Sequence, residues 1–228
     1  MNRGVNRDVS PVRREPWDWS LYLVTDRQLI GSRALEEVVQ AAVRGGVSAV
    51  QLREKNCSTR EFAALGKRLK AWLDPWGVPL IINDRVDVAL AVEAAGVHLG
   101  QSDMDCSAAR RLLGPRAAIG LSVESMEQAE AAAGLDLDYL AVSPLWATPT
   151  KTDTATPWGL EGLAALRRVS SHPLVAIGGI HLGNAARAFA AGADGIAVVS
   201  AICAAADPEN AARELRQIAD AVRSNRRK

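Results

Sequence analysis

The sequence predicts a single α/β domain folded as a (β/α)8 TIM barrel. Short apolar runs rich in β-branched residues recur at a fairly even spacing, and each precedes a segment of helical period rich in Ala, Leu, Glu and Arg. This alternation is typical of βαβ units that build a parallel sheet. Eight such pairs fit within 228 residues, without a break in composition. Eight pairs favour a closed barrel over the alternative, an open doubly wound sheet of about five or six strands.

The predicted strands and the segments between them follow in a regular order. The strands are residues 21–26 (LYLVTD), 49–54 (AVQLRE), 79–84 (PLIIND), 97–101 (VHLGQ), 118–123 (AIGLSV), 139–144 (YLAVSP), 173–179 (PLVAIGG) and 195–201 (GIAVVSA). Ser58 followed by Glu61 predicts a capping box at the start of a helix, and Asp207 before Pro208 predicts another helix start. The sequence GADG at residues 192–195 predicts the end of the seventh helix and the turn into the last strand.

The N-terminal residues 1–18 carry charges throughout and lack the apolar segment of a secretory signal or a membrane anchor. We therefore expect Met1 to Asp18 to be a flexible extension and residues 19–228 to form the catalytic barrel.

Composition restricts the class of partner. The 27 basic side chains nearly cancel the 26 acidic ones, so the chain lacks the positive excess that favours nucleic-acid binding, and a small molecule is the expected ligand. The three cysteines form no CxxC pair, which indicates a reducing cytoplasm. No membrane partner is expected, and assembly into a homo-oligomer remains open.

Polar residues gather where the predicted strands end, the end at which TIM barrels place their active sites. Asp84 and Asp103 stand at the ends of neighbouring strands, and Mg²⁺ prefers one or two carboxylates together with water and phosphate oxygens. Arg53, Lys55 and Lys151 then neutralise a diphosphate. Taken singly, Asp84 fits a helix cap near Val86 and the basic residues fit solvated loops. Their joint occurrence at successive strand ends favours a magnesium–diphosphate site.

A second group of residues stands at the seventh and eighth strands. Gly179 ends one predicted strand, and Val199 and Ser200 lie near the end of the other, where barrel loops commonly bind a phosphate through backbone N–H groups. A glycine pair also suits an ordinary tight turn. Two phosphate sites across one barrel mouth predict two phosphorylated substrates, or one substrate with a phosphate at each end.

Seven motifs together resemble one family. In chain order they are YLVTD from Tyr22, QLREK from Gln51, INDRVDVAL from Ile82, GVHLGQSD from Gly96, TPTK from Thr148, VAIGGI from Val175 and GADGIAVVSAI from Gly192. The set resembles thiamine phosphate synthase, also called thiamine phosphate pyrophosphorylase. QLREK and HLGQSD in this order are specific, whereas GGI is shared by many phosphate-binding barrels.

The resemblance implies a transferase that joins a pyrimidine diphosphate to a thiazole phosphate and releases diphosphate. It places the pyrimidine diphosphate on Gln51, Arg53, Lys55, Asn83, Ser122 and Lys151, Mg²⁺ on Asp84 and Asp103, and the thiazole phosphate near Thr148, Thr150, Gly179, Val199 and Ser200. Within these sets Arg53, Lys55, Ser122 and Lys151 are the candidate catalytic residues. No protein nucleophile is implied, because catalysis comes from alignment and from stabilisation of the departing diphosphate.

Some residues depart from the family pattern, and other functions compete. Ser143 and Trp146 stand where the family often has glycine and phenylalanine, and residues 147–159 are expected to form a loop or a lid. A thiazole tautomerase-like isomerase of the same superfamily would need no metal pair. A noncatalytic barrel that binds a phosphorylated ligand is another alternative, and a sugar-phosphate epimerase is disfavoured because no histidine stands at a strand end. His98, within a strand, is interpreted as a core histidine.

Overall fold

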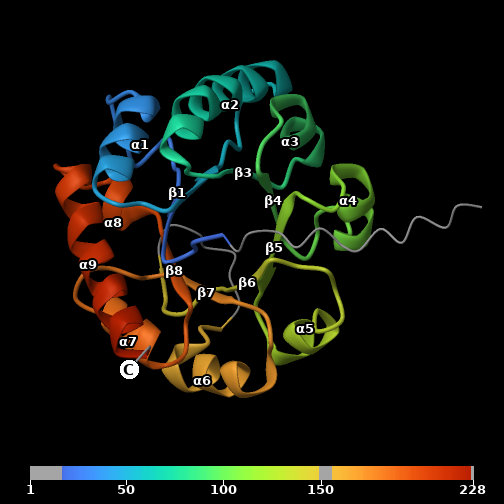
Figure 1. The fold of residues 1–228 in the computed structure, drawn as a ribbon, viewed down its shortest axis with the longest axis vertical. Coiled ribbons are helices and arrows are strands. Elements are labelled where there is room, and N and C mark those ends of the chain that lie inside the picture. Colours follow the sequence, from blue (N-terminus) through green and yellow to red (C-terminus); the bar gives the residue numbers. More distant parts are fainter. Residues whose placement is uncertain (1–16, 149–155, 227–228) are drawn as a thin grey trace, which may run out of the picture.

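A computed structural model of the chain describes residues 17–148 and 156–226. Eight parallel strands form a closed barrel in which each strand pairs with the next along the chain and the last pairs with the first (Figure 1). The predicted TIM barrel is thereby confirmed. The strands are β1 (Leu21–Val24), β2 (Ala49–Leu52), β3 (Leu80–Asn83), β4 (Gly96–Leu99), β5 (Ala118–Val123), β6 (Tyr139–Val142), β7 (Leu174–Ile177) and β8 (Gly195–Val198).

Helices surround the barrel as an outer ring (Figure 1). They are α1 (Leu35–Arg44), α2 (Thr59–Leu73), the 3₁₀ turn η1 (Asp74–Trp76), α3 (Val86–Val92), α4 (Cys106–Leu113), α5 (Met126–Ala131), α6 (Gly159–Val169), α7 (Ala185–Ala190), α8 (Ser200–Cys203) and α9 (Pro208–Arg226). The short α8 follows β8 directly and precedes the long α9. The first turn of α8 therefore lies at the end of the last strand, on the side where the predicted site residues gather.

The helix starts follow the signals in the sequence. The Ser58 hydroxyl accepts a hydrogen bond from the Glu61 backbone N–H at 3.2 Å, and the Glu61 carboxylate accepts one from the Ser58 backbone N–H at 2.9 Å. The predicted capping box is thus confirmed, and it satisfies two backbone donors at the start of α2. Asp207 accepts from the Asn210 backbone N–H at 3.0 Å and caps α9, which begins at Pro208 as predicted.

Two apolar layers lie on either side of the barrel wall. Alternate strand residues point to opposite faces of the sheet, so Leu21 and Leu23 join the large cluster under the helices, while Tyr22 and Val24 join a smaller cluster inside the barrel. The inner layer becomes polar toward the carboxyl ends of the strands. The same alternation that fills the core therefore aims polar side chains into the barrel mouth.

The amino-terminal end of the barrel is closed by Trp19. Its ring lies 4.5 Å from that of Tyr139 and 5.6 Å from that of Tyr22, centroid to centroid. Asp18, the last residue of the predicted extension, forms ion pairs with Arg216 and Arg223 of α9 at 3.2 and 2.6 Å. Trp17 of the predicted extension packs against the inner cluster, and residues 1–16 lie outside the described residues. Within the described ranges, no helix combines the length and the apolarity needed to cross a membrane.

Candidate active site

A cavity of about 420 Å³ opens at the carboxyl ends of the strands, a size common for small-molecule sites. Most of the predicted site residues line it together: Gln51, Arg53, Lys55, Asn83, Asp84, Asp103, Ser122, Thr148, Gly179, Val199 and Ser200. The predicted residues Thr150 and Lys151 lie outside the described residues. The structure therefore brings the described candidates to one place.

The end of β2 supplies the cationic side of the cavity. Arg53 is held by its backbone N–H, which donates to the Thr25 hydroxyl at 3.0 Å. Its guanidinium is 3.5 Å from Asp26. The next residue, Glu54, points away from solvent with a side chain only 4% exposed and accepts two hydrogen bonds from Arg27, at 3.0 and 2.8 Å. This bidentate pair, in which Glu54 is buried and Arg27 is half exposed, fixes the segment between the two cations Arg53 and Lys55.

A sharp backbone turn stands at Asp84, whose carboxylate lines the cavity and contacts Lys55. Asp84 has a φ of 62°, in the left-handed region that non-glycine residues rarely adopt. Its N–H continues the sheet by donating to the His98 carbonyl at 2.8 Å, and the next N–H, of Arg85, turns back to the Asn83 carbonyl at 2.7 Å. The Asp84 side chain makes no cap for α3. The alternative interpretation of Asp84 as a helix cap is therefore wrong.

Asp84 and Asp103 form an acidic pair with a cation beside it. The Lys55 ammonium donates to one Asp84 oxygen at 2.5 Å, and the Asn83 amide donates to the other at 2.7 Å. Burial raises the pKa of Asp103, and the adjacent charge of Asp84 raises it further, although the Gly100 N–H and Lys55 act in the opposite direction. Two interacting carboxylates attract positive charge. This set of hard oxygen donors fits Mg²⁺, which takes one or two carboxylates and completes its shell with water and phosphate oxygens.

The opposite side of the cavity is built from backbone. Gly178 and Gly179 have φ values of 102° and 66°, and a Cβ atom on Gly179 would come within 2.9 Å of the Ala147 carbonyl oxygen and of Trp146 Cβ. Only glycine therefore allows the loop after β6 to pack against this turn. Asn184 donates to the Gly179 carbonyl at 2.9 Å. With the first turn of α8 next to it, this region presents backbone amides, the arrangement that commonly binds phosphate in barrels.

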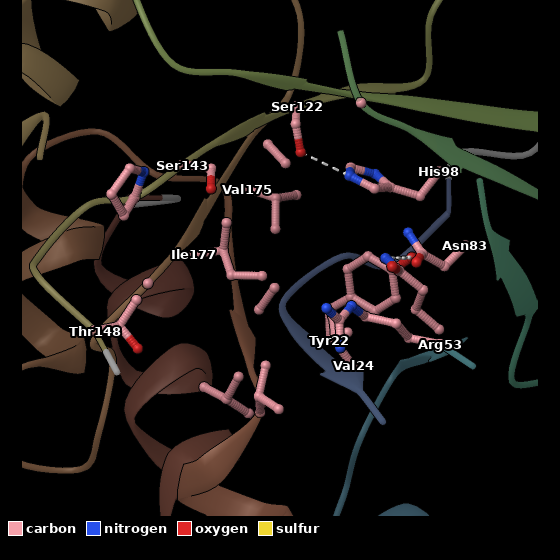
Figure 2. Close-up of a pocket in the computed structure, with 18 of the residues that line it drawn as sticks. Tyr22, Val24, Arg53, Asn83, His98, Ser122, Ser143, Thr148, Val175 and Ile177 are labelled. Carbon is pink, nitrogen blue, oxygen red and sulfur yellow. Dashed lines mark hydrogen bonds between the residues drawn. The ribbon is translucent and has the colours of Figure 1, made fainter. Parts of the chain in front are cut away.

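The two sides face each other across the barrel mouth. Arg53 and Asn83 lie on one side, and Ser143 and Thr148 lie on the other (Figure 2). Of the two departures from the family pattern, Ser143 is buried at the cavity edge and Trp146 packs on Gly179. The predicted lid includes residues 149–155, which lie outside the described part of the chain.

Residues 21–202 match the family model described as "Thiamine monophosphate synthase". The chain belongs to this family. A thiamine-phosphate synthase from Albidiferax ferrireducens is 62% identical over 202 residues, covering 89% of this chain and 92% of the relative. Another, from Syntrophomonas wolfei, is 53% identical over 201 residues, covering 88% of this chain and 96% of the relative.

A solved structure agrees with these family members. The thiamine phosphate pyrophosphorylase from Pyrococcus furiosus superposes with a TM-score of 0.83 at 40% identity, covering 90% of this chain and 97% of that one. A 3-hexulose-6-phosphate synthase, at 18% identity and a TM-score of 0.65, shows only that the fold is shared. The motif-based resemblance to the thiamine phosphate synthase family, a family of transferases in thiamine biosynthesis, is therefore confirmed.

The cavity of this chain also has a buried polar floor, formed in part by residues that the sequence did not assign to the site. Tyr22 and Tyr139, the only tyrosines of the chain, lie there with His98 and connect Gln51 to Ser122 by hydrogen bonds. His98 is 8% exposed and satisfied at both ring nitrogens, which confirms its interpretation as a core histidine. The sequence did carry a signal for these tyrosines. Residues two positions apart along a strand share a face, and each tyrosine stands two positions from other inward-facing residues.

Proposed function

We propose that this chain condenses a pyrimidine diphosphate with a thiazole phosphate to give thiamine phosphate and diphosphate. The observation that carries the proposal is the opposition, across one cavity, of a cationic and acidic side around Arg53, Lys55, Asp84 and Asp103 and a backbone-amide side around Gly179. Relatives that cover about nine-tenths of the chain and bear the name thiamine-phosphate synthase support the same reaction.

The first substrate is proposed to bind on the cationic side. Arg53 has a planar guanidinium that suits two diphosphate oxygens at once, and Lys55 acts as a point charge. Lys151, from the loop after β6, is proposed to complete this set. The pyrimidine ring is proposed to lie deeper, against the polar side chains of Gln51, Asn83 and Ser122, all of which line the cavity.

Mg²⁺ is proposed to be held by Asp84 and Asp103. When bound, the ion neutralises negative charge on the diphosphate and thereby stabilises it as a leaving group. Lys55, which pairs with Asp84 at 2.5 Å, is within reach of the same charge and is proposed to exchange its carboxylate partner for the diphosphate.

The thiazole phosphate is proposed to bind on the backbone-amide side, with Thr148 and Thr150 nearby. Its phosphate is placed against Gly179 and the turn formed by Val199 and Ser200. Glycine at this turn leaves room for close approach of the ligand, and N–H groups at the start of a helix carry partial positive charge. In this position the thiazole ring is proposed to face the pyrimidine methylene.

The reaction requires alignment rather than a protein nucleophile. The bond between the pyrimidine methylene carbon and the diphosphate oxygen breaks, and its electron pair leaves with the diphosphate. The lone pair of the thiazole nitrogen then forms the new carbon–nitrogen bond. Arg53 and Lys55 stabilise the charge that develops on the leaving group, and the two binding sides hold the reacting atoms together.

The test is an assay of inorganic diphosphate release with both substrates and MgCl₂. Asp84→Asn and Asp103→Asn remove charge from the acidic pair and are expected to lower kcat/KM by about 10²-fold or more. Asp87→Asn is the control for the first, because Asp87 is exposed and pairs with Arg85 outside the cavity. Asp105→Asn is the control for the second, because asparagine also caps a helix and Asp105 caps α4.

Three outcomes distinguish the functions. Release of diphosphate only when both substrates are present, with loss in Asp84→Asn but not in Asp87→Asn, supports the synthase. Isomerisation of a thiazole substrate without Mg²⁺, unaffected by Asp84→Asn, would establish the tautomerase alternative. Binding of one phosphorylated ligand in calorimetry without turnover on adding the second would establish a noncatalytic barrel.

A further inference from the structure

Five polar side chains from five strands form a continuous hydrogen-bonded relay across the floor of the cavity. Gln51 Nε2 donates to the Tyr22 hydroxyl at 3.0 Å, and this hydroxyl lies 3.1 Å from that of Tyr139. The Tyr139 hydroxyl is 2.9 Å from His98 Nδ1, and His98 Nε2 is 2.9 Å from Ser122 Oγ. The last contact is the dashed line between Ser122 and His98 in Figure 2. Both ends of the relay line the cavity.

Donor and acceptor counting gives the relay a direction. An amide nitrogen only donates, so Tyr22 accepts from Gln51. The other hydrogen-bond partner of the buried Tyr22 hydroxyl is Tyr139, and because an unpaired buried hydrogen is costly, Tyr22 donates to Tyr139. Tyr139 in turn has its hydrogen left for His98 Nδ1, which must then be unprotonated. A neutral imidazole with an unprotonated Nδ1 carries its hydrogen on Nε2 and donates it to Ser122.

We propose that His98 is a positioning residue. In its neutral Nε2–H tautomer it donates a hydrogen bond to the Ser122 oxygen, and the Ser122 hydroxyl hydrogen is then directed toward the ligand. At the other end, Tyr22 holds the Gln51 amide nitrogen and leaves the amide oxygen as an acceptor. The floor then matches a ring edge that offers one acceptor and one donor. An aminopyrimidine has such an edge, so this inference rests on the proposed function and adds how its ring is oriented.

The surroundings keep the relay rigid and uncharged. Tyr22 and Tyr139 are fully buried, and burial raises the pKa of both hydroxyls far above their usual range, so both remain donors. The His98 and Tyr139 rings are nearly parallel, at 16°. Gly120 leaves the space that the Tyr139 ring fills, since a Cβ there would lie 2.0 Å from its Cζ. Networks that are fully satisfied and buried specify one arrangement.

The first test measures the tautomer directly and needs no substrate. In ¹⁵N-histidine-labelled protein the chain gives only three imidazoles, and His98 is assigned from the spectrum of the His98→Asn variant. We expect Nδ1 of His98 to resonate as an unprotonated nitrogen and Nε2 as a protonated one. An Nδ1–H tautomer or a charged imidazolium at neutral pH would overturn the proposal.

The second test separates positioning from a structural role. His98→Gln carries an amide near the place of Nε2 and can still donate to Ser122, whereas His98→Asn reaches only toward Tyr139. We expect His98→Asn to lower kcat/KM by about tenfold, as for one lost hydrogen bond, and His98→Gln to recover most of it. Melting curves identify any variant that is not folded at the assay temperature. If His98→Asn is not folded, Tyr139→Phe is used in its place. This variant removes the hydroxyl that donates to His98 Nδ1 and is expected to show a similar loss of kcat/KM.

A double-mutant cycle decides whether the effect passes through Ser122. In a Ser122→Ala background the further loss on His98→Asn should disappear, because the group being oriented is gone. Equal losses in both backgrounds, or equal activity of His98→Gln and His98→Asn, would refute the positioning role. If the wild-type protein released no diphosphate at all, the proposed reaction would fail, while the tautomer measurement would still report on the relay.

Discussion

Gly120→Ala should overpack the interior of the barrel against the ring of Tyr139. A Cβ on Gly120 lies 2.0 Å from Cζ and 2.4 Å from the hydroxyl oxygen of Tyr139, whereas ordinary contacts begin at 3.4 Å. The ring must therefore withdraw by about 1.4 Å, and it is fully buried beneath its neighbours. Overpacking of this kind costs about 1–3 kcal/mol.

The expected loss is measurable by thermal unfolding followed by circular dichroism. For a domain of this length each kcal/mol lowers Tm by about 2–4 °C, so Gly120→Ala should melt roughly 2–12 °C below the wild type. Displacement of the Tyr139 hydroxyl, now 2.9 Å from His98, should also lower kcat/KM. Gly134→Ala is the matched control, because a Cβ there meets nothing within 4 Å. If both variants melted with the wild type, the argument from close packing would be wrong.

Three further variants test other contacts. Ser58→Ala removes the capping box of α2 and should cost about 1 kcal/mol in unfolding by urea, with KM unchanged because Ser58 does not line the cavity. Glu54→Ala breaks the pair with Arg27, which is half exposed, so it should cost at most about 1 kcal/mol in stability while lowering kcat/KM through the adjacent cations. Asp18→Asn tests pH dependence: burial alone would raise the pKa of Asp18, but hydrogen bonds from a neighbouring serine and the charges of two arginines on α9 hold that pKa below its ordinary value. Because that pKa is depressed in the folded state, the carboxylate stabilises the protein above the unfolded-state value and the benefit is lost as pH falls. The Tm difference between wild type and Asp18→Asn should therefore be present at pH 7 and shrink steadily as the pH falls below the unfolded-state pKa of the carboxyl, and a difference that stays constant would contradict it.

The sequence by itself determined the architecture and the main polar residues at the cavity mouth. Strand and helix periods, the Ser58 capping box and the Pro208 helix start are local signals, because they depend on neighbouring residues along one segment. Once the strands are parallel and closed into a barrel, their carboxyl ends must meet. The polar residues that end them, such as Asn83 and Asp103, could therefore be assigned to one mouth without coordinates.

Only the tertiary structure decided which of these side chains touch. The turn at Asp84 that brings its carboxylate to Lys55, and the link from Gln51 through two tyrosines to Ser122, join residues up to 117 positions apart. Such contacts depend on the register between strands and on how rings fill the barrel, and a sequence pattern of period two fixes only which face a residue occupies. For the same reason Trp19 was assigned no role from sequence, although its ring closes the far end of the barrel beneath both tyrosines.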